Sequence, residues 1–134
     1  MFKLNPPWRG LPIAINPGKQ VVYHATALKN WERISKRGIR PRKLPSVLAK
    51  EVELTRGIYV GGLSFIRDFA EGEADSMIDL GEADSPVDMA IIEISVPMNV
   101  NLIQDPNFPG EESYIVNTVV YPKDVRLREV VTYP

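Results

Sequence analysis

The pattern of hydrophobic and polar positions predicts helices early in the chain and strands late. A first strand is expected at residues 21–24, where strand-forming residues precede a histidine. A short amphipathic helix is expected at about residues 27–37, because apolar side chains recur on one face at Leu28, Trp31 and Ile34. The main role expected of this helix is packing.

Polar residues mark both ends of this first helix. Thr26 stands where an N-cap hydroxyl is expected, and Gly38 stands where a helix commonly ends in a glycine. The next stretch, residues 37–50, combines cations with prolines, so we predict a basic, kinked loop. Its composition agrees both with a solvated loop and with a loop that covers phosphates.

A second helix and several strands are predicted farther along. A short strand at residues 56–61 ends in paired glycines, and a helical pattern begins at Leu63. Residues 72–85 carry the pentapeptide Gly-Glu-Ala-Asp-Ser twice but lack the ligand order of an EF-hand, so we predict a solvated acidic helix end and loop. The later strands are predicted at residues 87–96, 100–103, 114–120 and 125–131. This order favours an α+β fold with mixed or antiparallel pairing.

The first twenty residues form a different kind of segment. Four prolines and two glycines exclude a continuous helix, while apolar residues such as Trp8 and Leu11 can hold the segment against a domain. We therefore predict an extended N-terminal arm at residues 1–20 and a single domain at residues 21–134.

Composition narrows the functional classes. The chain has 134 residues, of which 44% are hydrophobic and 25% charged, which is typical of one compact domain. It contains no cysteine and one histidine, which excludes disulfides and thiolate chemistry and argues against a zinc site. A net charge of −1 gives no overall field for nucleic acid, although a local patch still can. Without a signal-like or membrane-length apolar run, we expect a soluble, cytoplasmic protein with no membrane partner.

His24, the only histidine, is the first candidate for a functional residue. It stands where a strand passes into a helix, and unpaired backbone NH groups and the helix dipole at such a junction favour anionic ligands. A structural histidine and a ligand-binding histidine both agree with this position. Tyr59 is similar, because beside glycines its ring either lines a cleft or packs in the core.

Three short motifs follow one another along the chain. They are Tyr-His-Ala-Thr at residues 23–26, Gly-Ile-Tyr-Val at residues 57–60 and Ser-Tyr-Ile-Val at residues 113–116. In this order they resemble the ADP-ribosyltransferase superfamily, specifically the His-Tyr-Glu clade of diphtheria toxin, poly-ADP-ribose polymerases and tRNA 2′-phosphotransferases. The resemblance spans about residues 21–131. It implies an α+β, ADP-ribosyltransferase-like split β-sheet core with two short helices in the N-terminal half, and it implies NAD+ as a substrate with no metal.

The resemblance also implies roles for individual residues. His24 would hydrogen-bond the adenosine-side ribose, the backbone of Ala25 would hold the nicotinamide amide, and Thr26 would be a supporting hydroxyl. Tyr59 would stack on the nicotinamide ring, with Phe69 behind it. The cations expected near the pyrophosphate are Arg40, Arg42 and Lys43.

The third motif departs from the family at its catalytic residue. A direct overlay places Ser113 where the family has a glutamate, and a serine cannot stabilise an oxocarbenium-like centre through charge. Glu112 lies one residue upstream, where a bulge at the loop-to-strand boundary can re-aim it. Three hypotheses stay open: Glu112 is the catalytic carboxylate, Ser113 occupies the position in a slower mono-transferase, or the site binds a nucleotide without chemistry.

The function implied by the resemblance is NAD+-dependent mono-ADP-ribosylation of a macromolecule, with a protein side chain as the expected acceptor. The small size would suit a bacterial toxin or a phage effector. One alternative is an RNA 2′-phosphotransferase-like or DNA-modifying enzyme, in which the basic loop at residues 36–50 would hold phosphates. The other is a catalytically degenerate module that binds NAD+, ADP-ribose or a partner protein.

Overall fold

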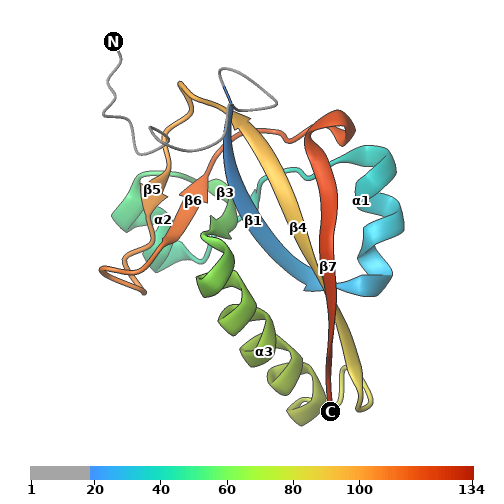
Figure 1. Cartoon of the computed structure of the whole chain (residues 1–134). Helices are drawn as coiled ribbons and strands as arrows, with labels where there is room; N and C mark the ends of the chain where they lie inside the picture. Colours follow the sequence, from blue (N-terminus) through green and yellow to red (C-terminus); the bar gives the residue numbers. More distant parts are fainter. Residues whose placement is uncertain (1–18) are drawn as a thin grey trace.

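One antiparallel sheet of seven strands forms the centre of the molecule in the computed structural model, which describes residues 19–134 (Figure 1). Its strands are β1 (Lys19–Ala27), β2 (Arg42–Lys43), β3 (Arg56–Gly61), β4 (Val87–Pro97), β5 (Ile103–Gln104), β6 (Ser113–Val116) and β7 (Val125–Tyr133). The order across the sheet is β5-β6-β3-β1-β4-β7, and the short β2 pairs with β3. The predicted α+β class with antiparallel pairing is confirmed.

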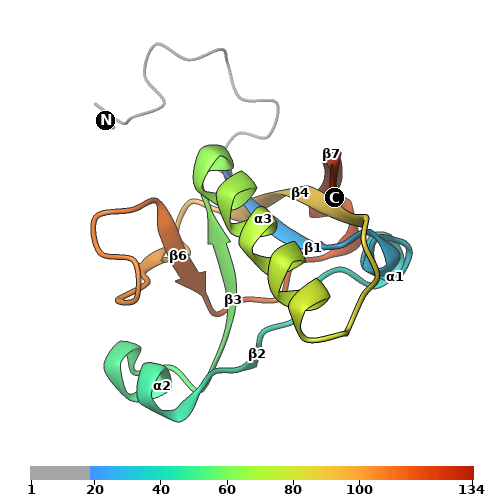
Figure 2. The ribbon, with the colours of Figure 1, turned by 90° about the horizontal axis from the view of Figure 1, so that it is seen from below.

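The helices cover both faces of the sheet. They are α1 (Trp31–Arg37), α2 (Ser46–Val52) and α3 (Leu63–Asp79), with 3₁₀ turns η1 (Leu28–Asn30) and η2 (Pro122–Asp124). Helix α3 crosses one face of β1 and β4, and α1 lies on the opposite face (Figures 1 and 2). Two short helices, α1 and α2, lie in the N-terminal half, but α2 was not predicted, and the helix predicted from Leu63 is the 17-residue α3.

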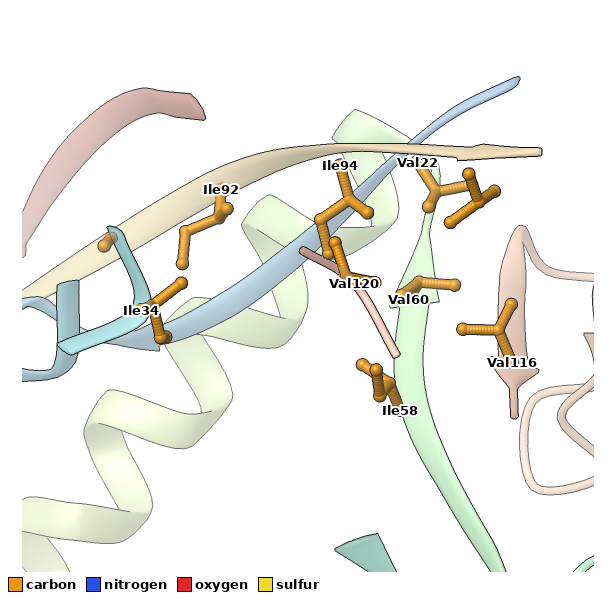
Figure 3. Close-up of a cluster of buried hydrophobic side chains, with 10 residues drawn as sticks. Val22, Ile34, Ile58, Val60, Ile92, Ile94, Val116 and Val120 are labelled. Carbon is orange, nitrogen blue, oxygen red and sulfur yellow. The ribbon is translucent and has the colours of Figure 1, made fainter. Parts of the chain in front are cut away.

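Strand β4 supplies the core on both sides of the sheet. Successive side chains of a strand point to opposite faces, so Ile92 and Ile94 pack beside Ile34 of α1, whereas Met89 and Ile91 pack against α3. Figure 3 shows the first of these clusters, in which residues of β1, β3 and β6 surround the β4 isoleucines. Full burial on both faces explains why β4 has a nearly continuous apolar sequence.

The first strand is longer than predicted at both ends. It begins at Lys19, within the segment assigned to the arm, and pairs with β4 as far as Ala27. Thr26 therefore lies inside the strand, and the prediction that it caps a helix is wrong. Its Oγ1 instead accepts a hydrogen bond from Asn30 Nδ2 at 2.9 Å. The rest of the predicted arm, residues 1–18, lies outside the described residues.

Three local predictions are wrong. The stretch predicted as a basic loop contains α2, whose Leu48 is buried with Leu44 and Ile115. An isolated helix of seven residues is marginal in water, so this tertiary contact is what stabilises it. The strand predicted at residues 100–103 shrinks to the two residues of β5, and the one predicted at 114–120 ends at Val116.

Helix α1 ends at a glycine, as predicted, and this end touches a distant part of the chain. Gly38 has φ +75° and ψ −162°, a conformation that is essentially restricted to glycine. A methyl group on its Cα would overlap the carbonyl oxygen of Val120. The neighbouring Ile39 and Val120 exchange two backbone hydrogen bonds of 2.8 Å each. The segment between β6 and β7 is thereby joined to the end of α1.

We expect Gly38→Ala to lower the free energy of unfolding more than Gly81→Ala. Both glycines have positive φ, +75° and +73°, so each alanine incurs a backbone cost of at least about 1–2 kcal/mol. Gly38 adds two further costs: its ψ of −162° suits glycine alone, and its new Cβ would overlap Val120. At Gly81, no atom of the described residues beyond its chain neighbours lies within 4 Å of such a Cβ. Urea denaturation of the two variants measures the difference. Equal losses would contradict the close approach of Val120 to α1.

Candidate functional site

The sheet opens between β1 and β3. These two strands pair only at Tyr23 and Gly61, whereas β1 pairs with β4 along its whole length and β3 pairs with β6 at four positions. Figure 2 shows β3 turning away from β1 toward β2 and α2. His24 follows the paired Tyr23 on β1, and Tyr59 lies two residues before the paired Gly61 on β3. Both residues line a cleft at this opening.

His24 spans this opening through its imidazole. Its Nδ1 lies 2.7 Å from the backbone oxygen of Tyr59. A carbonyl oxygen only accepts hydrogen bonds, so Nδ1 carries a proton and donates it. In the neutral ring the other nitrogen, Nε2, is then an acceptor. The fold thus fixes the tautomer of His24 and leaves one nitrogen to accept a hydrogen bond from a ligand hydroxyl.

The surroundings of His24 favour its neutral form. Burial lowers its pKa from the ordinary value of 6.5, the hydrogen bond to Tyr59 opposes this effect, and the nearby charge of Arg42 lowers the pKa further. Because the folded pKa lies below the unfolded one, His24 contributes stability above pH 6.5 that is lost as the pH falls through the folded pKa. Near neutral pH the cleft therefore contains a neutral imidazole.

The cleft has a volume of about 850 Å³ and a strongly basic lining. This volume lies within the range of small-molecule and cofactor sites. Among the described residues, no carboxylate lines it, and none of its cations forms an ion pair with a carboxylate. These cations are Arg33, Arg37, Arg40, Arg42 and Lys43. An excess of unpaired guanidinium groups suits phosphate, which arginine binds through paired hydrogen bonds.

Three elements position these cations. Arg33 and Arg37 lie four residues apart on α1, so they share one face of the helix. Arg40 follows the turn at Gly38. Arg42 and Lys43 form β2, whose pairing with β3 fixes them beside the strand that carries Tyr59. The cleft is therefore lined by α1 on one side and β2 on the other, with His24 between β1 and β3.

The structure brings together some of the residues singled out from the sequence. His24, Thr26, Tyr59, Arg40 and Arg42 all line the cleft, together with Lys43. Tyr59 is 36% exposed, and partial burial and the charge of Asp105 raise the pKa of its phenol. The ring is therefore accessible and stays protonated near neutral pH.

The remaining predicted residues lie outside the cleft lining. The side chain of Ala25 packs in the cluster beneath α3. Phe69 lies on α3, and its ring stacks on that of Phe65 with centroids 6.3 Å apart. The structure does not place Phe69 in the cleft with Tyr59.

Glu112 and Ser113 lie beside the far end of β3. Ser113 is 3% exposed and pairs with Gly61, so it shares a sheet face with Tyr59, two residues away on β3. Glu112 is exposed, and its backbone oxygen accepts a hydrogen bond from the NH of Gly62 at 3.0 Å. A Cβ on Gly62 would lie 2.6 Å from Glu112 Oε1, which places the carboxylate against the start of α3. Neither residue lines the cleft that contains His24.

Sequence reasoning missed two features of this region. Arg33 and Arg37 belong to the cleft, and their spacing of four residues on a predicted helix was the signal for a shared face. Asp105 is a carboxylate with 1% exposure, whose Oδ1 accepts a hydrogen bond from the NH of Asn107 at 2.9 Å. An aspartate at the start of a proline-containing turn is a common turn signal, so no local pattern indicates its effect on Tyr59.

Comparisons with models of protein families, with curated proteins and with solved structures found no significant match to this chain. Among the helices of residues 19–134, none combines the length and the apolar character needed to cross a membrane.

We expect the imidazole of His24 to titrate below pH 6.5 in the folded protein, because burial and Arg42 both disfavour its charged form. The chain has one histidine, so a single imidazole resonance followed by NMR across the pH range gives the midpoint directly. Arg42→Gln should raise this midpoint, whereas Arg128→Gln, outside the cleft, should leave it unchanged. A wild-type midpoint at or above 6.5 would overturn the assignment of a neutral histidine.

Proposed function

We propose that this protein is an NAD+-dependent mono-ADP-ribosyltransferase that modifies a macromolecule, built on an ADP-ribosyltransferase-like split sheet. The observation that carries the proposal is the hydrogen bond of His24 to Tyr59 across the opening of the sheet, within a cleft lined by cations. The adjacency of β1, β3 and β6, the strands of the three motifs, also supports it. This hydrogen bond joins two residues that are far apart in sequence and that the resemblance assigns to NAD+ binding.

The chemistry of the cleft suits the parts of a dinucleotide. Nε2 of the neutral His24 accepts a hydrogen bond from a ribose hydroxyl. Arg40, Arg42 and Lys43 neutralise the pyrophosphate, and the exposed ring of Tyr59 offers a stacking surface for nicotinamide. In this proposal the backbone of Ala25 holds the amide of the ring. Phe69 has no role in this proposal, because its ring stacks on Phe65 and does not line the cleft.

The proposed reaction needs a carboxylate near the reacting ribose carbon. Cleavage of the nicotinamide bond develops positive charge there, and a fixed negative charge stabilises it. Ser113 is buried and uncharged, whereas Glu112 is exposed beside the same end of β3. We therefore assign the role of catalytic carboxylate to Glu112, which must approach the cleft when NAD+ binds. Ser113 then has a structural role, as a buried residue paired with the end of β3.

We expect the wild-type protein to consume NAD+ and to transfer labelled ADP-ribose to a macromolecule in a cell lysate. His24→Ala, Tyr59→Ala and Glu112→Gln should each reduce the rate, Glu112→Gln by about 100-fold or more, since positioned charge stabilisation in active sites has this size. Glu111→Gln is the matched control, because it removes the adjacent exposed carboxylate. Full activity of Glu112→Gln would show that Glu112 is not the catalytic carboxylate and would leave Ser113 as the candidate.

A catalytically degenerate binding module would give different results in assays of thermal stability and NAD+ consumption. A module that only binds NAD+ or ADP-ribose would show a ligand-dependent rise in thermal stability without consumption of NAD+. His24→Ala should abolish that rise. Absence of both consumption and stabilisation would contradict any NAD+ site in the cleft.

A further inference from the structure

The cleft contains more positive charge than a dinucleotide needs. Five cations line it, without a carboxylate in the lining and without an ion-pair partner among residues 19–134. NAD+ presents a single pyrophosphate and a positively charged nicotinamide ring. The cations in excess of that requirement can neutralise the phosphates of a second ligand. The surplus thus indicates a second ligand that carries phosphates.

The cations fall into two groups by the elements that carry them. Arg42 and Lys43 form β2, which pairs with β3 beside Tyr59. Arg33 and Arg37 lie together on one face of α1. In the binding mode proposed above, the cations of β2 bind the pyrophosphate of the dinucleotide. Arg33 and Arg37 are then available for the phosphates of another molecule.

An exposed aromatic residue lies next to the end of α1. Tyr121 is 59% exposed, and its Cα would lie 3.1 Å from a Cβ on Gly38, a residue of the cleft lining. The paired hydrogen bonds between Ile39 and Val120 hold the backbone before Tyr121 in this position. Cations combined with an accessible aromatic ring are the usual elements of single-stranded nucleic-acid binding, in which bases stack and phosphates pair.

The opposite face of the sheet has the opposite charge. Helix α3 exposes a row of carboxylates and one arginine, and it lies across the sheet from α1 (Figures 1 and 2). The exposed carboxylates are Asp68, Glu71, Glu73, Asp75 and Asp79. The protein has a net charge of only −1, so this separation, rather than any overall charge, directs a polyanion to the α1 face.

We propose that the acceptor of the ADP-ribosyl group is a polynucleotide, whose phosphodiesters bind Arg33 and Arg37 and one of whose bases stacks on Tyr121. This proposal rests on the function proposed above. In the transfer, the bond between the ribose C1′ and the nicotinamide nitrogen breaks, and its electron pair neutralises the pyridinium ring. An oxygen or nitrogen lone pair of the polynucleotide forms the new bond to C1′, and the displaced proton passes to Glu112 or to water.

Binding of a labelled single-stranded oligonucleotide, measured by fluorescence anisotropy at several salt concentrations, tests the surface without requiring catalysis. We expect binding that weakens with salt, and a slope of log Kobs against log salt that falls by about 1.4 in the Arg33→Gln/Arg37→Gln double variant, about 0.7 for each lost phosphate contact. Arg126→Gln/Arg128→Gln is the matched control, because it removes two exposed charges from β7. Tyr121→Ala should weaken binding about fivefold or more with little change in slope.

Transfer assays with RNA and DNA oligonucleotides and labelled NAD+ complete the test and distinguish the two kinds of strand. Label on either oligonucleotide, reduced in the double variant and in Tyr121→Ala, supports the proposal and names the strand. Consumption of NAD+ with label only on protein, and no oligonucleotide binding, overturns a nucleic-acid acceptor and leaves the transferase intact. Absence of NAD+ consumption overturns the transferase, and with it the assignment of an acceptor.

Discussion

In the part of the chain that the structure describes, one side-chain hydrogen bond crosses the opening in the sheet, and it joins the two strands that border the cleft. Each strand at the opening keeps its own outer partner, β4 for β1 and β6 for β3, so the two halves of the sheet stay regular where they part. His24 donates to a backbone oxygen of β3, which cannot rotate away as a side chain can. The orientation of the imidazole and the separation of the strands therefore fix each other.

The near-zero net charge conceals an uneven distribution. Acidic side chains gather on α3, and the cations of α1 and β2 gather on the other side of the sheet around His24. The sheet separates the two groups, and neither is neutralised by the other. The same field that favours phosphates in the cleft also helps to keep His24 neutral, so ligand preference and protonation state have a common origin.

The parts of the fold that follow from local sequence were predictable, and those that follow from distant contacts were not. The apolar run of β4, the helical period of α3 and the glycine that ends α1 each depend on neighbouring residues, and each was found. Helix α2 depends on Ile115, more than sixty positions from its Leu48, and β1 extends to Ala27 because β4 pairs with it. In the candidate site, the motifs predicted roles for His24 and Tyr59, and the structure places both on the lining of one cleft. No motif could show that the side chain of Glu112 lies against Gly62 at the start of α3, because these two residues are fifty positions apart in the sequence.

The bridge between Ile39 and Val120 affects when the contacts around the cleft form during synthesis of the chain. It closes a loop between an early and a late segment of the chain, and contacts of such sequence separation form slowly because closure entropy must be overcome first. A chain emerging from the ribosome has α1 and β2 long before it has residue 120. The wall of the cleft formed by the turn after α1 therefore gains this support only after residue 120 has been added to the chain.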